Sequence, residues 1–286
     1  DFCLSRGLGD VYKRQIVLLA GIAMNILTAW IIFFAVSIMG TPTIVDEYGP
    51  MTETAELAVI NVLPDSPAAA ANIPLGAQIV DLTSSDEVLL SPTPTTFNDF
   101  IAAHADRGIE INYVHKEEVF RATLTPRAGV IDAEPDRKAV GLATALVTVH
   151  KENLPGALIG ATKRTASSLY TITIGLVSFL ASAFTLSADV SQVTGPIGIA
   201  GMVGDAAEFG FVSLLIFTAF ISLNLAVINL LPIPALDGGR LLFVIAEAII
   251  RRPIDPEWMA RVNFAGFVLL IGLMIAVTYN DILRLF

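Results

Sequence analysis

Three long stretches without a charged residue limit what this 286-residue chain can fold into. Residues 15–45 contain no Asp, Glu, Lys or Arg, and residues 209–236 and 262–280 form two further uncharged runs. About 20 consecutive apolar residues cross the hydrocarbon core of a bilayer, and buried helices of soluble proteins rarely contain runs of this length. The sequence therefore predicts an α-helical polytopic membrane protein with transmembrane helices in the ranges 16–40, 208–238 and 262–280.

A fourth uncharged run, residues 165–188, contains many Ser and Thr side chains. This composition fits a spanning helix and a helix lying on or against the membrane equally well. The range 128–207 is therefore interpreted as a linker followed by a membrane-associated helical region.

The overall composition supports a membrane location and excludes several other classes. Charged residues make up 15% of the chain and the mean hydropathy is +0.70, whereas soluble domains carry about 25% charged residues. The net charge of −10 provides no basic face for nucleic acid. The single cysteine, Cys3, excludes a disulfide scaffold and a Cys-rich zinc site.

The segment between the first and second spans has a different character. Residues 41–208 contain 20 acidic and 9 basic residues, which predicts a water-facing α+β domain. We expect strands at 58–62, 78–82, 109–114 and 119–124, and a short helix at 98–104. The short loop 239–261 carries four arginines (Arg240, Arg251, Arg252 and Arg261). The positive-inside rule then places this loop in the cytoplasm and the acidic domain outside it.

Polar residues at membrane depth mark the second predicted span. Pro232 and Pro234 interrupt a regular helix, and Asp237 follows them. An ionised carboxylate at this depth requires a cation, such as a metal ion, or it caps the next helix, which begins near Gly238. In the first span, Asn25 is expected either to hydrogen-bond across helices or simply to pack there.

The string Asn229-x-x-Pro232-x-Pro234-x-Leu236-Asp237-Gly238-Gly239 resembles a signature of the site-2 protease family of intramembrane zinc metalloproteases. The resemblance implies that Asp237 is the third zinc ligand. It also implies that Asn229, Pro232 and Pro234 hold an extended substrate. Gly21-x-x-x-Asn25 matches the family's second-helix motif. The supporting residues then expected are Gly21, Asn25, Asn224 and Gly238.

Two further segments agree with this resemblance. Gly195-Pro196-Ile197-Gly198-Ile199 resembles the family's Gly-Pro-Ile segment upstream of the signature helix. Residues 62–70 resemble the start of the PDZ domain in the regulator of sigma-E protease branch. We therefore expect a PDZ-like domain at 52–127 that binds a peptide or only filters substrates sterically. Its expected loop is Ile73, Pro74, Leu75 and Gly76. Asn72 stands where the family usually has Gly, and Ala77 where it usually has Asp.

The resemblance implies a zinc-dependent endopeptidase of the bacterial cytoplasmic membrane that cleaves single-span, membrane-anchored substrates. In the family, two His of an HExxH helix join the Asp on zinc, and the Glu acts as general base. This chain contains no HExxH, and His104, His115 and His150 all lie in the acidic segment.

The missing motif leads to an expectation about the chain as given. Residues 1–15 do not resemble the start of a membrane protein, and we interpret them as a non-native leader on an N-terminally truncated fragment. The chain as given is expected neither to hold catalytic zinc nor to cleave peptides. The alternatives are a pseudoprotease or non-catalytic PDZ-containing scaffold, and a small transporter with a broken helix. An internal repeat would support the transporter, and the sequence shows none.

Overall fold

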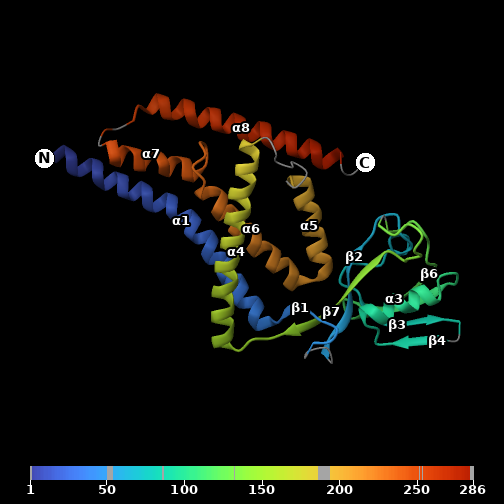
Figure 1. Ribbon diagram of the computed structural model, residues 1–286. Coiled ribbons are helices and arrows are strands. Elements are labelled where there is room, and N and C mark those ends of the chain that lie inside the picture. The colour runs from blue at the N-terminus through green and yellow to red at the C-terminus, as the bar shows by residue number, and fades with distance from the viewer. Residues whose placement is uncertain are drawn as a thin grey trace. The chain divides into compact units, whose positions relative to one another are not determined.

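The computed structural model describes residues 2–49, 54–85, 87–131, 133–185, 194–250, 252 and 254–283, with side chains from residue 19 onward except at 183–184. Within this part the chain divides into two compact units. One comprises residues 1–37, 153–203 and 215–286, and the other comprises 38–152 and 204–214. The first is helical, and the second contains an antiparallel sheet (Figure 1).

Among the described residues, four helices are long and apolar enough to cross a bilayer. The qualifying segments are Leu19–Met39 of α1 (Phe2–Met39), Leu154–Ser182 of α4 (Leu154–Phe184), all of α6 (Phe211–Leu230) and all of α8 (Pro256–Leu283). Three of them coincide with the predicted spans. The fourth, α4, contains much of the Ser- and Thr-rich run and is the least apolar of the set. Two shorter helices, α5 (Pro196–Phe209) and α7 (Asp237–Ile250), complete the helices outside the sheet region.

The helix boundaries differ from the predicted ranges in two places. The range 208–238 is not one helix, because α5 ends at Phe209, Gly210 has a φ of +116°, and α6 ends at Leu230. The prolines explain the second break, since each lacks an N–H and restricts the residue before it. The range 239–261 is not simply a loop either, because α7 occupies it as far as Ile250.

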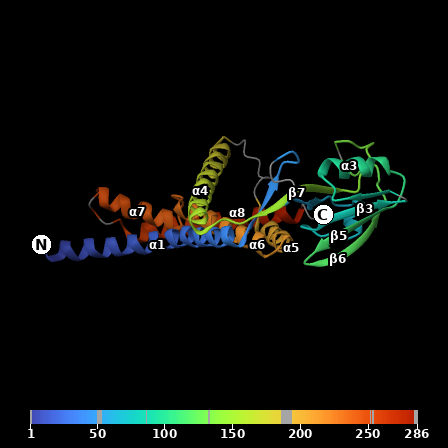
Figure 2. The same cartoon turned by 90° about the horizontal axis from the view of Figure 1, so that it is seen from below.

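Small side chains let α1, α4 and α6 pack closely. Ala29, Ala161 and Ala219 are fully buried in one apolar cluster that also contains Phe33 and Leu223. Small residues at such crossings allow close backbone approach, which is how helices associate in lipid. The Trp30 Nε1 atom donates a hydrogen bond to Thr162 Oγ1 at 3.1 Å, which joins α1 to the N-terminal half of α4. Later turns of α4 extend away from α1 (Figure 2).

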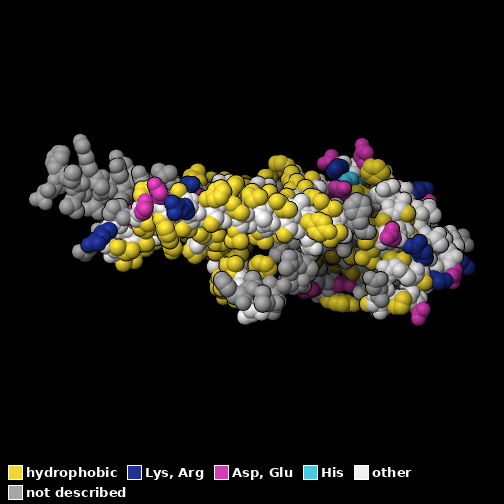
Figure 3. Space-filling model, turned by 90° about the horizontal axis from the view of Figure 1, so that it is seen from above, with side chains coloured by type: hydrophobic (Ala, Val, Ile, Leu, Met, Phe, Trp, Pro, Cys, Tyr) yellow, Lys and Arg dark blue, Asp and Glu magenta, His cyan; other side chains and the backbone are white. Residues whose placement is uncertain are grey.

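The outward faces of the helices are apolar. On α8 the exposed side chains include Phe264, Phe267, Leu269, Leu273 and Ile275. Figure 3 shows hydrophobic side chains covering this face of the helices. Exposed apolar surface of this extent is expected where lipid is the solvent.

The second unit is a curled antiparallel sheet with the strand order β1-β7-β2-β3-β5-β6, and β4 pairs with β3. The strands are β1 (Thr41–Val45), β2 (Glu56–Val62), β3 (Gln78–Ser84), β4 (Glu87–Leu90), β5 (Ile109–His115), β6 (Glu118–Leu124) and β7 (Leu142–His150). The helices α2 (Pro67–Ala70) and α3 (Pro94–Ala103) belong to the same unit. The four predicted strands and the short predicted helix are all present, with ends shifted by a few residues.

The core of this unit lies between the sheet and α3. Inward-facing residues of β3 and β5, among them Ile79, Leu82, Ile109 and Ile111, are buried with Phe97 and Ile101 of α3. The sheet extends beyond the predicted domain 52–127, because β7 is a strand inside the range 128–207 and β1 begins at residue 41. β7 joins the sheet through non-local pairing, which local sequence patterns do not reveal.

Candidate functional site

The segment between α6 and α7 contains the residues that the sequence marks as functional. Leu231–Leu236 is non-helical and turns back on itself through hydrogen bonds from Ile233 N to Leu231 O at 2.8 Å and from Leu236 N to Ile233 O at 3.2 Å. Ala235 has a φ of +77°, and its N–H donates to Asn263 Oδ1 of α8 at 3.2 Å. Asn263 therefore ties the turn to α8, a contact that sequence reasoning did not identify.

Three glycines allow the turn to lie close to the neighbouring helices. A Cβ added at Gly238 would lie 2.2 Å from Leu231 O, and one at Gly239 would lie 2.2 Å from Ile233 O. On α8, a Cβ at Gly266 would lie 2.4 Å from Pro234 O. All three glycines are buried. The two glycines of the motif thus allow the start of α7 to pack against the backbone of the turn. This close packing is the structural role of Gly238.

The motif residues with expected ligand or substrate contacts differ in their exposure to solvent. Asn229 is half-buried in the last turn of α6, Pro232 is exposed, and Pro234 and Asp237 are half-buried. Asp237 is the first residue of α7, where the helix dipole favours a carboxylate. Among the described residues, neither the Asp237 carboxylate nor the Asn229 amide has a hydrogen-bond or ion-pair partner.

The expected supporting residues occupy different positions. Ser222 Oγ of α6 donates a hydrogen bond to the backbone oxygen of Asn25 at 2.9 Å, so the bond between the two helices uses the Asn25 backbone. Asn224 is exposed and its Nδ2 donates to Phe220 O of its own helix. A Cβ at Gly21 would meet no described atom within 4 Å, so the structure shows no close helix approach there.

The Gly-Pro-Ile segment is fixed by a buried carboxylate. Asp281, near the end of α8, accepts hydrogen bonds from the backbone N–H groups of Gly195 at 3.1 Å and Gly198 at 2.9 Å. These groups lie at the start of α5, where N–H groups have no partner inside the helix. Asp281 is only 5% exposed. The contact explains why glycine occupies position 195, because a Cβ there would lie 2.6 Å from the Asp281 carboxylate.

The described residues alone do not fit a catalytic zinc ion. Such an ion is usually held by three protein ligands. The described part of the chain contains no group of three or more His, Cys, Asp or Glu side chains that could hold a metal. The three histidines belong to the sheet unit, where the His104 imidazole contacts Phe100 and Glu87. Asp237 belongs to the helical unit and is one ligand at most.

The sheet unit has its own groove, between α3 and β7. A cavity of about 220 Å³ is lined by Phe97, Asn98 and Ile101 of α3 and by residues 137–143. β2 pairs with β7 along Leu142–Val147, whereas β1 pairs only with Leu146–His150. Residues 142–145 of β7 therefore have one edge without a strand partner among the described residues.

The expected PDZ loop does not line this groove. Gly76 instead lies on the other side of the unit, where a Cβ would be 3.1 Å from the Phe209 Cα atom. Ile73 and Ala77 are buried core residues, which accounts for Ala in place of a charged residue at 77. Asn72 has a φ of +54° and so adopts the backbone conformation that favours Gly.

Comparison with known proteins assigns the chain to a family. The model of peptidase family M50 matches residues 8–273, which includes part of the range 1–15 that the sequence analysis set apart. The zinc metalloprotease RasP of Geobacillus kaustophilus is 30% identical over 96% of this chain and 60% of its own length. The regulator of sigma-W protease RasP of Bacillus subtilis is 30% identical over 98% of this chain and 61% of its own length. A putative zinc metalloprotease of Clostridium perfringens is 32% identical over 95% of this chain and 73% of its own length. The chain thus spans about 60% of the length of the two RasP relatives.

Proposed function

Because this chain belongs to peptidase family M50, the site-2 protease family, we propose that the whole protein is an intramembrane zinc metalloendopeptidase. Its substrates would be single-span membrane proteins, and it would act in the bacterial cytoplasmic membrane. The observation that supports this proposal is the segment Asn229–Asp237, in which a broken helix presents an amide and a carboxylate that have no partner among the residues that the structure describes. Irregular backbone at membrane depth is tolerated where it is packed in protein or lines a wet cavity.

In this proposal each residue of the segment has a distinct role. Asp237 is one zinc ligand, and the other ligands do not come from the described residues. The Asn229 amide can donate and accept hydrogen bonds at once, which suits the backbone of an extended substrate. Exposed Pro232 and half-buried Pro234 keep the segment non-helical, so that a substrate can lie along it as an added strand.

The cleavage test uses a fusion protein in which a helix carrying HExxH directly precedes Ile16 of this chain. We expect this protein to cleave a membrane-anchored reporter, and Asp237→Asn to abolish cleavage without lowering expression. The control is Asp205→Asn, which alters an exposed carboxylate on α5. Cleavage by the Asp237→Asn variant at the parent rate would remove Asp237 from the metal site.

The chain as given, without that helix, is proposed to be inactive because it offers too few metal ligands. Purified from zinc-containing medium, it should carry far less than one zinc ion per chain. Zinc at one equivalent per chain would contradict this proposal.

A second proposal concerns the sheet unit, which we infer to be a PDZ-like, extracytoplasmic domain that binds extended peptides. The groove between α3 and β7 supports it, because Leu142 and Ala143 line it together with Phe97 and Ile101 of α3. These two residues of β7 have one edge without a strand partner among the described residues. An extended peptide adds to such an edge through backbone hydrogen bonds. If the domain binds peptides but the HExxH-joined chain cleaves nothing, the scaffold alternative is favoured.

A matched pair of variants tests this groove. Asn98 and Asp99 are adjacent and exposed on α3, but only Asn98 lines the groove. Asn98→Trp should fill the groove and weaken binding of a fluorescent peptide several-fold in an anisotropy titration. Asp99→Trp should bind as the parent does. Equal affinities for all three proteins would place the peptide elsewhere.

A further inference from the structure

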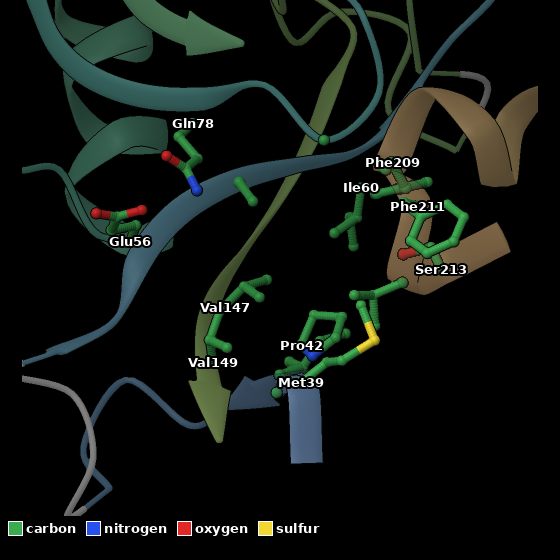
Figure 4. Close-up of a pocket in the computed structure, with 16 residues that line it drawn as sticks. Met39, Pro42, Glu56, Ile60, Gln78, Val147, Val149, Phe209, Phe211 and Ser213 are labelled. Carbon is green, nitrogen blue, oxygen red and sulfur yellow. The ribbon is translucent and has the colours of Figure 1, made fainter. Parts of the chain in front are cut away.

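The sheet unit has an apolar hollow on the side away from the peptide groove, and every residue that lines it belongs to that one unit. The hollow has a volume of about 670 Å³ and lies between one face of β1, β2 and β7 and the link from α5 to α6. Met39, Pro42, Ile44, Val149, Phe209 and Phe211 form its apolar part. Figure 4 shows Glu56 and Gln78 together at the opposite end.

Large apolar side chains around the hollow are open to solvent. Ile44 is 65% exposed, Val149 61% and Phe211 65%. Glu56 is the one charged residue in the lining. A patch of this kind on the water-facing part of a protein marks a binding surface.

The ends of two candidate membrane spans form part of this hollow. Met39 is the last residue of the span Leu19–Met39, and Phe211 is the first residue of the span Phe211–Leu230. Helix α6 has 20 residues and is about 30 Å long at 1.5 Å per residue, which equals the thickness of the hydrocarbon core. When α6 spans the bilayer, its first residue, Phe211, lies at the boundary between acyl chains and headgroups, and the hollow that Phe211 lines lies there too.

We propose that the apolar hollow is a membrane-docking surface, in which β1, β7 and the α5–α6 link insert into the adjoining leaflet and acyl chains of phospholipids fill the space. The polar end at Glu56 and Gln78 then faces the headgroups. This inference goes beyond the proteolytic function and does not depend on it. It gives the sheet unit a fixed depth at the membrane surface, whereas a domain tethered only by its linkers would move freely in water.

Two edge strands of the same sheet provide the test. Ile44 on β1 and Val119 on β6 are both exposed β-branched residues, at 65% and 75%, and they lie at opposite ends of the strand order. The single cysteine of the chain is first removed by Cys3→Ser. Three variants on this background, Ile44→Cys, Val149→Cys and Val119→Cys, are then each spin-labelled. The full chain is then reconstituted in vesicles of phosphatidylethanolamine and phosphatidylglycerol. Two collision rates are measured for each label. One is the rate with oxygen, which concentrates in lipid, and the other is the rate with a water-soluble nickel chelate.

We expect the oxygen-to-nickel ratio to be several-fold higher at positions 44 and 149 than at position 119. Unchanged thermal unfolding of the labelled variants shows that the labels leave the fold intact. Labels at 44 and 149 that are as accessible to nickel as the label at 119 would overturn the proposal, since the hollow would then be open to water or to a soluble partner. Labels reached by neither probe would also overturn it, because protein would then cover the hollow.

Discussion

Single residues set the geometry of the turn between α6 and α7. On α8, Gly266 supports Pro234, whereas a Cβ at Gly272 would meet nothing within 4 Å. Replacing each of these two glycines in turn separates the effect of close packing, which applies only at Gly266, from the general effect of replacing glycine in a helix.

We expect Gly266→Ala to lower the stability of the protein in detergent by about 1–3 kcal/mol, the usual cost of overpacking. Gly272→Ala should leave the stability unchanged or raise it slightly. Thermal unfolding followed by circular dichroism measures both. Equal shifts for the two variants would show that the turn does not pack against Gly266.

His115 gives the sheet unit a pH dependence. Burial lowers the pKa of this imidazole, the neighbouring Lys116 lowers it further, and Glu208 partly opposes them. Since the folded pKa lies below the ordinary value, the unfolded chain binds the proton more readily. The contribution to stability is then present above about pH 6.5 and is lost as the pH falls through the folded pKa.

We therefore expect His115→Gln to flatten the loss of stability between pH 7 and 5, as measured by urea unfolding at a series of pH values. His150→Gln is the control, because this exposed histidine is also at the end of a strand. Parallel profiles of stability against pH for the parent and the His115→Gln variant would contradict the assignment of this pH dependence to His115.

At the scale of elements, a few polar contacts join apolar helices. The bond from Trp30 to Thr162 joins α1 to α4, and the Asp281 carboxylate joins α8 to the start of α5. In each case a hydrogen bond adds a directional contact to helices that otherwise pack through apolar side chains. Such contacts define the register of packing between helices, which apolar contacts alone leave adjustable.

The Asp281 contact predicts a local effect. Asp281→Asn removes the charge that strengthens two hydrogen bonds, and we expect a stability loss of about 1–3 kcal/mol. Backbone amides at the start of α5 should exchange hydrogen faster, as measured by mass spectrometry on peptides covering residues 195–209. Asp255→Asn, outside this contact, should leave that exchange unchanged. Unaltered exchange at α5 in the Asp281→Asn variant would argue against the cap.

At the scale of the whole molecule, patterns along the chain predicted the elements better than their connections. The apolar runs identify α1, α6 and α8 because a bilayer demands about 20 apolar residues, and alternation identifies β2, β3, β5 and β6. β1 and β7 were missed because their pairing with each other joins residues about 100 positions apart. Local patterns contain no information on such pairing.

Only part of the candidate site could be predicted from the sequence, because some of its residues act on distant parts of the chain. The prolines and glycines of the motif act locally, so their effect on α6 and α7 follows from the sequence. Asn263, Gly266 and Asp281 act across helices, and an amide, a glycine or a carboxylate inside an apolar run does not reveal its partner. The groove between α3 and β7 could not be predicted, because the sequence does not reveal the position of β7.

The most direct test of the central claim, that Asp237 is a zinc ligand of a family M50 metalloprotease, is the zinc content of the purified protein. The chain joined to an HExxH helix and its Asp237→Asn and Asp205→Asn variants are compared by mass spectrometry of the metal after dialysis against a weak chelator. We expect about one zinc ion per chain in the parent and in Asp205→Asn, and a large loss in Asp237→Asn, because three protein ligands usually hold a catalytic zinc. Full zinc retention by Asp237→Asn would contradict the claim.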